Sequence, residues 1–230
     1  MTESTKAQGM AQGNKKTVFV VDDHPLLRQG LALLINREPD LMVCGEAEEA
    51  QAAMRAIATN RPDILIVDIS LNGPDGLDLL KNIRNSYPDL PVLILSMHDE
   101  SIYAERALRA RANGYIMKHE ATEKVLIAVR RILGGDFYLS ERMANKVLHQ
   151  YISGASADKN SRLSALSDRE LEVFRLIGEG RSTRQIAEDL HLSIKTVETY
   201  QAHIKEKLAL RSGRELVQHA IQSKISEKNT

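Results

Sequence analysis

The stretch ILIVDIS, residues 64–70, is an apolar run that closes on an acidic residue, Asp68. Similar short apolar runs recur in the first half of the chain, separated by helical patterns: TVFVVDD (17–23), LMVCGEA (41–47), PVLILSM (91–97) and GYIMK (114–118). Strands that are apolar throughout and alternate with helices are typical of a parallel sheet covered on both faces. Residues 17–135 are therefore expected to form a doubly wound α/β domain with a five-stranded parallel sheet.

The segments outside this domain have compositions of their own. Residues 1–16 are polar, contain glycine and show no periodicity, which predicts a disordered leader. Residues 136–161 hold a helical pattern followed by the small and polar run SGASADKNS, and we expect a linker with a helical segment.

Residues 162–226 have helical patterns throughout, and serine residues mark the starts of the helices. Ser167, Ser182 and Ser212 are each followed three residues later by Glu or Gln, which is the pattern of a capping box. Ser193 opens a further helix. We therefore expect four short helices that form a small all-α domain.

The composition indicates a soluble protein of two domains. The chain has 230 residues and a hydrophobic fraction of 43%, and no apolar run approaches the roughly 18 residues that cross a bilayer. Its start lacks the apolar middle of a secretory signal, and the single cysteine, Cys44, is expected in the core. A cytoplasmic location without a membrane partner follows. The net charge of zero does not by itself favour a nucleic-acid partner.

Polar residues stand at the ends of the expected strands. Asp22 and Asp23 follow the first run, Asp68 ends the third, Ser96 ends the fourth and Lys118 ends the fifth. Ligands of open α/β sheets bind beyond the carboxyl ends of the strands, so we expect these side chains to converge there. Clustered acids repel one another unless a cation joins them, and Mg²⁺ prefers carboxylate oxygens.

Asp68, beside Mg²⁺ and Lys118, is equipped to attack a phosphoryl group and become an aspartyl phosphate. Both cations would neutralise charge in the transition state. Each residue taken alone has a simpler interpretation: Asp68 as a helix cap or turn residue, Lys118 as a surface lysine, and Ser96 as a turn or cap. The agreement of all five positions favours the phosphoacceptor.

Four motifs resemble the receiver domain of two-component response regulators: VDDHP (21–25), DIS-x-x-GPDG (68–76), LS (95–96) and GY-x-x-K (114–118). The resemblance implies a flavodoxin-like fold. It also implies that Asp23, Asp68 and the backbone carbonyl of Ser70 bind Mg²⁺, with Asp22 bound through water.

The same resemblance implies a switch. A histidine kinase would donate phosphate to Asp68, the Ser96 hydroxyl would turn toward the phosphoryl oxygens, and Tyr115 would swing inward to fill the vacated space. Without the resemblance, Tyr115 is a half-buried aromatic residue of a strand.

Residues 166–212 predict a helix, a tight turn and a second helix, the geometry that lays the second helix in the major groove of DNA. Glu198 can accept a hydrogen bond from cytosine N4, and Thr199 and Ala202 can contact a thymine methyl group. The basic residues can contact phosphates. The candidate DNA contacts are Arg184, Lys195, Thr196, Glu198, Thr199, Ala202, His203 and Lys205. A four-helix protein-interaction module with a solvated outer face is the alternative, and spacing alone does not decide between them.

Three motifs in this region, LSDRELEVFRLIGEG (166–180), QIAEDLHLSIKTVETY (185–200) and IKEKL (204–208), resemble the LuxR-type helix-turn-helix domain. Together the two resemblances identify a response regulator of the NarL/FixJ class. They imply a transcription regulator that is not an enzyme beyond its own phosphotransfer. They also imply double-stranded DNA as a partner and a homodimer when phosphorylated, with the fourth helix as a dimer surface.

Other classes of protein fit the residues less well. A phosphatase with an aspartyl-phosphate intermediate usually carries a second acid two residues after the nucleophile, and position 70 is serine. A regulator that senses a small molecule needs an apolar pocket, and the aromatic fraction is 4%. A nucleotide-binding domain needs a Gly-rich loop after its first strand, and this sequence has none there.

Overall fold

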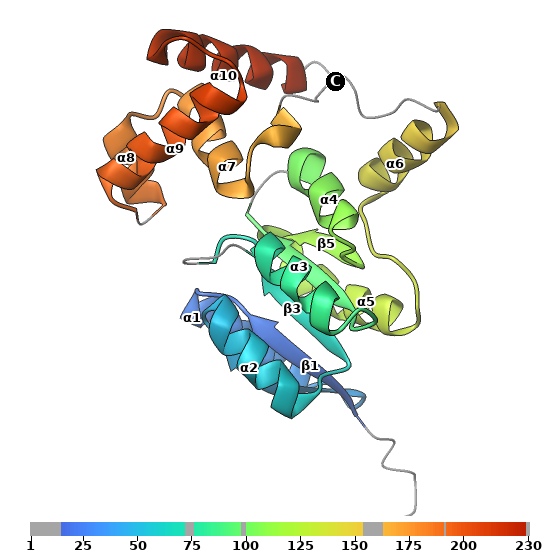
Figure 1. Ribbon diagram of the computed structural model, residues 1–230. Coiled ribbons are helices and arrows are strands. Elements are labelled where there is room, and N and C mark those ends of the chain that lie inside the picture. Colours follow the sequence, from blue (N-terminus) through green and yellow to red (C-terminus); the bar gives the residue numbers. More distant parts are fainter. Residues whose placement is uncertain (1–14, 72–75, 98–99, 154–162, 191, 229–230) are drawn as a thin grey trace, which may run out of the picture. The chain divides into compact units, whose positions relative to one another are not determined.

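The computed structural model describes residues 15–71, 76–97, 100–153, 163–190 and 192–228 (Figure 1). The chain divides into two compact parts, with the boundary between His149 and Gln150. In the described ranges, no helix combines the length and the apolar character that a membrane crossing requires. The expected leader, apart from its last two residues, and most of the expected linker run lie outside these ranges.

The first part contains the predicted five-stranded parallel sheet, which is confirmed. The strands are β1 (Lys16–Val21), β2 (Leu41–Ala47), β3 (Ile64–Asp68), β4 (Val92–Ser96) and β5 (Gly114–Met117). Their order in the sheet is β2-β1-β3-β4-β5, and every neighbouring pair is parallel. The order therefore reverses at β1, which places the carboxyl ends of β1 and β3 side by side at the switch point.

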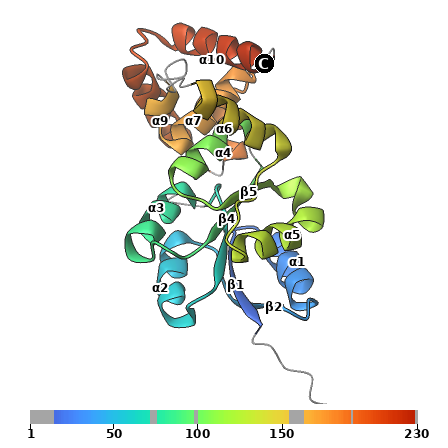
Figure 2. The ribbon, with the colours of Figure 1, turned by 90° about the vertical axis from the view of Figure 1, so that its right-hand side faces the viewer.

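Helices cover both faces of the sheet (Figure 2). They are α1 (Pro25–Asn36), α2 (Ala50–Asn60), α3 (Gly76–Ser86), α4 (Glu100–Arg109) and α5 (Ala121–Leu133). In Figure 2, α1 and α5 lie on one side of the strands, and α2 and α3 lie on the other. The central strand β3 is buried along its whole length, which explains its unbroken apolar sequence.

Cys44 lies on the edge strand β2 and is only half-buried, so the expectation of a core cysteine is wrong. An edge strand has a neighbour on one side alone, which leaves part of its surface open. The fifth strand also ends one residue early, at Met117. Lys118 opens a short 3-10 helix, η1 (Lys118–Glu120).

The chain after α5 continues to pack on the first part. Tyr115 donates its backbone N–H to the Tyr138 carbonyl at 3.0 Å, and Tyr138 donates to the Asn113 carbonyl at 3.0 Å. Ser140 then donates its hydroxyl to the Glu100 carboxylate at 2.5 Å, just before α6 (Glu141–Ser153). The first compact part therefore extends past residue 135, the end of the expected α/β domain.

The second part consists of helices, as expected. They are η3 (Leu163–Ala165), α7 (Asp168–Gly178), α8 (Thr183–Asp189), α9 (Ile194–Lys207) and α10 (Gly213–Lys228). The capping boxes at Ser167 and Ser182 are confirmed with both of their hydrogen bonds. Ser212 accepts from the backbone of Glu215, but the Glu215 carboxylate accepts from Arg211, so this box is half formed.

Glu170 joins the start of α7 to the end of α9. Its carboxylate accepts hydrogen bonds from the backbone N–H of Ser167 at 2.7 Å and from the Lys207 ammonium at 2.6 Å. Burial by itself raises the pKa of the Glu170 carboxyl, but these hydrogen bonds outweigh burial and hold the pKa below its usual value. The charged form of Glu170 is therefore part of the folded structure.

Gly76, the first residue of α3, leaves room for the backbone that follows Asp68. Its N–H donates to the Ile69 carbonyl at 2.8 Å. A Cβ atom at position 76 would lie 1.9 Å from the carbonyl oxygen of Asp68 and 2.9 Å from the Ile69 Cα. The neighbouring atoms belong to the backbone and cannot rotate away.

We expect Gly76→Ala to destabilise the first part by about 3 kcal/mol or more, because the clash must be relieved by moving the backbone. The matched control is Gly30→Ala, since Gly30 lies in the exposed interior of α1 with no atom within 4 Å of the added Cβ. For this control, the free energy of unfolding is expected to rise by up to about 1 kcal/mol. Urea unfolding followed by circular dichroism measures both, and equal effects would contradict the packing argument.

We expect Glu170→Gln to lower the stability of the second part by about 1–2 kcal/mol at pH 7, because it removes a charge-assisted hydrogen bond. The folded pKa is lowered, so the stabilisation is present above the unfolded pKa of about 4.3 and is lost as the pH falls through the folded value. Calorimetry at several pH values should show the native and variant curves converging as the pH falls through the lowered pKa of folded Glu170. Glu188→Gln, at an exposed position, serves as the control and should lower the stability by about 0.5 kcal/mol or less.

Candidate functional site

Three acids and a lysine meet at the carboxyl edge of the sheet. Asp22 and Asp23 follow β1, Asp68 ends β3, and Lys118 comes directly after β5. The Lys118 nitrogen lies 2.7 Å from Asp68 Oδ2 and 2.9 Å from Asp22 Oδ2. Asp22 and Asp68 are fully buried, and Lys118 is nearly so. The structure thus brings together the strand-end residues that the sequence analysis selected.

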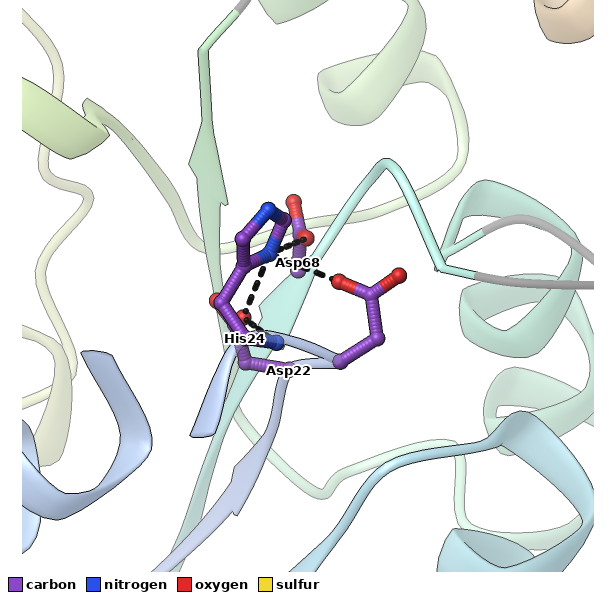
Figure 3. A group of neighbouring side chains, drawn as sticks. Asp22, His24 and Asp68 are labelled. Carbon is purple, nitrogen blue, oxygen red and sulfur yellow. Dashed lines mark hydrogen bonds and ion pairs between the residues drawn. The ribbon is translucent and has the colours of Figure 1, made fainter. Parts of the chain in front are cut away.

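His24 also belongs to this cluster, which the sequence analysis did not anticipate. Its Nδ1 lies 2.7 Å from Asp23 Oδ1, 3.2 Å from Asp22 Oδ1 and 3.9 Å from Asp68 Oδ2. Figure 3 shows the imidazole ring beside the Asp22 and Asp68 carboxylates. The sequence feature that could have predicted this is the place of His24 directly after the two acids in VDDHP, just before α1 begins at Pro25.

The electrostatics of the cluster oppose a charged Asp68. Burial raises the pKa of the Asp68 carboxyl; the Lys118 charge lowers it, the Asp22 charge raises it again, and the net pKa lies above its usual value. Hydrogen bonds from Lys118 to Oδ2 and from the Ser70 N–H to Oδ1, at 2.7 and 3.0 Å, hold the carboxylate in one orientation. An additional cation would therefore stabilise the ionised form.

The donor set fits a divalent cation. Ligand atoms of Asp22, Asp23, His24 and Asp68 all lie within 4.8 Å of one another. Within the described part of the chain, Asp22 Oδ2 and Asp23 Oδ1 are buried and accept no hydrogen bond, although Lys118 and His24 lie within ion-pair distance of them. Buried carboxylate oxygens with unused lone pairs are what Mg²⁺ binds in proteins.

The two residues expected to act as a switch lie in the same sheet. Ser96 ends β4 and is fully buried, one residue beyond Leu95, which pairs with Asp68. Tyr115 lies on β5 opposite Ile94 and is 2% exposed. This structure therefore holds Tyr115 inside the domain, the position that the sequence analysis assigned to the phosphorylated state.

In the second part, α8 and α9 form the expected helix-turn-helix. Ile186 and Ala187 of α8 and Val197 and Ile204 of α9 are buried, which leaves the opposite side of α9 outward. Lys195, Glu198, Thr199, Ala202 and His203 are exposed on α9, Thr196 and Lys205 are half-buried there, and Arg184 is exposed on α8.

Side-chain hydrogen bonds hold α9 in place. Ser193 caps its first turn by accepting from the Thr196 N–H at 3.0 Å, and Gln201 donates to the Thr183 hydroxyl of α8 at 3.2 Å. His203 has its Nδ1 3.7 Å from the Glu170 carboxylate. The His203 ring therefore lies on the side of α9 that meets α7, unlike the more outward Lys195 and Glu198.

Two family models match the chain. The response regulator receiver domain matches residues 18–130, and the luxR family of bacterial regulatory proteins matches residues 164–220. The first range covers the sheet with the acidic cluster, and the second covers the helix-turn-helix.

Curated relatives match over nearly their whole length. The oxygen regulatory protein NreC of Staphylococcus carnosus is 36% identical over 212 residues, which cover 90% of this chain and 98% of the relative. NreC of Staphylococcus epidermidis is 35% identical over 215 residues, which cover 91% of this chain and 99% of the relative. The match therefore includes both domains and the segment between them.

Solved structures of regulators are also similar. A LuxR-family two-component response regulator from Aurantimonas has a TM-score of 0.56 and 32% identity, covering 60% of this chain and 99% of that one. RcsB of Salmonella typhimurium has a TM-score of 0.55 and 26% identity, covering 90% of this chain and 98% of that one. With its receiver sheet, its helix-turn-helix and its full-length relatives, this chain belongs to the NarL/FixJ-class two-component response regulators, which have a receiver domain and a LuxR-type DNA-binding domain.

Proposed function

We propose that this response regulator is switched by Mg²⁺-dependent transfer of a phosphoryl group from a histidine kinase to Asp68. The observation that carries the proposal is the buried Asp68 carboxylate, held by Lys118 at 2.7 Å and adjoining the oxygens of Asp22 and Asp23. The members of this family are transcription regulators rather than enzymes, so the aspartyl phosphate is a signal and not an intermediate of turnover.

In the proposed transfer, an Asp68 carboxylate oxygen forms a bond to the phosphorus of a phosphohistidine. The phosphorus–nitrogen bond breaks, and its electron pair returns to the kinase imidazole. Asp23, Asp68 and the Ser70 carbonyl would hold Mg²⁺, with Asp22 acting through water, and the ion when bound would offset the negative charge of the phosphoryl oxygens. Lys118 adds a second, fixed positive charge.

The phosphoryl group then shifts an equilibrium between two conformations. Ser96 would donate its hydroxyl to a phosphoryl oxygen, and Tyr115 would be held in its buried position. Shifts of about 1–3 kcal/mol are typical of such coupling. We propose that the shift controls dimerisation or contacts between the domains, and that the regulator acts in the cytoplasm.

The proposed dimer surface is on α10. Val217 and Ile221 lie one helical turn apart, and they are 42% and 40% exposed. One similar structure is described as two RcsB dimers bound to two parallel DNAs, with 26% identity, a TM-score of 0.55 and coverage of 89% of this chain and 97% of that one. These observations support a dimer on DNA for this chain as well.

The proposed DNA-reading face is the outward side of α9. Glu198, Thr199 and Ala202 would face the base edges in the major groove, and Arg184, Lys195, Thr196 and Lys205 would contact phosphates. His203, beside Glu170, would lie at the margin of this face.

We expect the chain to gain the mass of one phosphoryl group when it is incubated with acetyl phosphate and Mg²⁺. Asp68→Asn should gain none, because the nucleophilic oxygen is lost, and chelation of Mg²⁺ should stop the reaction. The control is Asp89→Asn, which removes an exposed acid outside the cluster. Intact-mass spectrometry measures all four samples. Labelling of Asp68→Asn, or no labelling of the native chain, would count against the proposal.

We expect Lys195→Ala to weaken binding of the phosphorylated chain to a short random-sequence DNA duplex. If Lys195 contacts a phosphate, the slope of log affinity against log salt concentration falls by about 1 per bound chain. Lys81→Ala removes the same charge from the exposed side of α3, beside Asp78, and should leave the slope unchanged. Fluorescence anisotropy titrations at several salt concentrations measure this. Equal slopes for the two variants would exclude a phosphate contact by Lys195.

A further inference from the structure

Arg28 of α1 is a buried charged residue that touches the turn carrying the acidic cluster. Its Nη1 donates to the Asp22 carbonyl oxygen at 2.6 Å, and its side chain is 10% exposed. On the other side, Nη2 donates to the Glu48 carboxylate at 2.5 Å, and Nε lies 3.5 Å from Glu46. The guanidinium therefore links the backbone after β1 to the end of β2 and the residues that follow it.

The backbone of Asp22 is fixed on both of its polar groups. Its N–H donates to the Ala47 carbonyl at 3.1 Å, and its carbonyl oxygen accepts from Arg28. The Asp22 carboxylate in turn accepts from the His24 N–H at 2.8 Å, which closes the turn. Without Arg28, the Asp22 carbonyl would lose its charged donor, and the peptide that leads to Asp23 could rotate.

The positive charge of Arg28 is paired with carboxylates outside the acidic cluster. Glu46 and Glu48 balance it, while the contacts of the cluster carboxylates are to Lys118, His24 and Ser70. Burying a guanidinium costs desolvation energy, and the cost is offset only where its donors are satisfied in a fixed geometry. A guanidinium that makes two hydrogen bonds and lies 3.5 Å from a second carboxylate is suited to hold a backbone turn.

We propose that Arg28 is a positioning residue for the divalent-cation site: it fixes the turn at residues 22–24, so that the Asp22 and Asp23 carboxylates stand ready for the ion. The inference rests on the proposed function of the cluster, and it adds a link from that cluster to the segment between β2 and α2. Groups that orient metal ligands commonly change metal affinity about 10–100-fold when they are removed.

The test compares Mg²⁺ binding by the full chain and by three variants, measured by isothermal titration calorimetry. Arg28→Met removes the charge and keeps most of the length, and Arg28→Lys keeps the charge but not the fork of donors. The matched control is Arg130→Met, because Arg130 of α5 also binds two carboxylates, Glu38 and Asp40, but lies at the opposite end of β2. Thermal unfolding without Mg²⁺ is measured on the same samples.

We expect the Kd for Mg²⁺ to rise at least about tenfold for Arg28→Met, less for Arg28→Lys, and less than about twofold for Arg130→Met. A purely structural role would lower the melting temperature of Arg28→Met and leave its Kd at the native value. That result overturns the inference while the proposed function stands.

Absence of Mg²⁺ binding by the native chain would overturn the proposed function and this inference together. Should Arg28→Met fail to fold, as judged by circular dichroism, Glu48→Gln takes its place. This variant leaves Arg28 present but removes one of the carboxylates that orient it. A raised Kd in Glu48→Gln supports the inference, and a native Kd overturns it.

Discussion

Two buried carboxylates that share one ammonium group are the constraint on which the receiver domain depends. Asp22 and Asp68 would repel each other strongly in a buried environment, and Lys118 lies within 3 Å of both. Asp68 and Lys118 are 50 residues apart in the chain, so only a tertiary arrangement can join them. The parallel sheet does so, because strands that run in one direction have their carboxyl ends at one edge.

Contacts to the backbone around the cluster also hold its side chains in place. Gly76 allows α3 to begin against the Asp68 carbonyl, and Arg28 holds the Asp22 carbonyl. The helix-turn-helix follows the same logic with different parts, since Ser193 and Glu170 fix the two ends of α9. In both domains, hydrogen bonds from neighbouring residues therefore hold the elements that carry the functional side chains.

Much of this protein could be read from local patterns. The apolar runs predicted five parallel strands, and the residues at their ends predicted the acidic cluster with Lys118. The serine boxes predicted the starts of α7 and α8. Such features depend on residues close together in the chain, and periodicity and capping record them directly. The resemblance to receiver and LuxR-type domains then supplied the class, which the family matches confirm.

The sequence by itself therefore determined the two folds and the acids, but the tertiary structure decided which further groups surround them. His24 joins the carboxylates, Arg28 braces their turn, and His203 lies toward Glu170 rather than fully outward. The half-buried state of Cys44 was likewise decided by the place of β2 at the edge of the sheet. The physical reason is that side chains such as Arg28 and His203 take their direction from partners 20 or more residues away, and no local period carries that information.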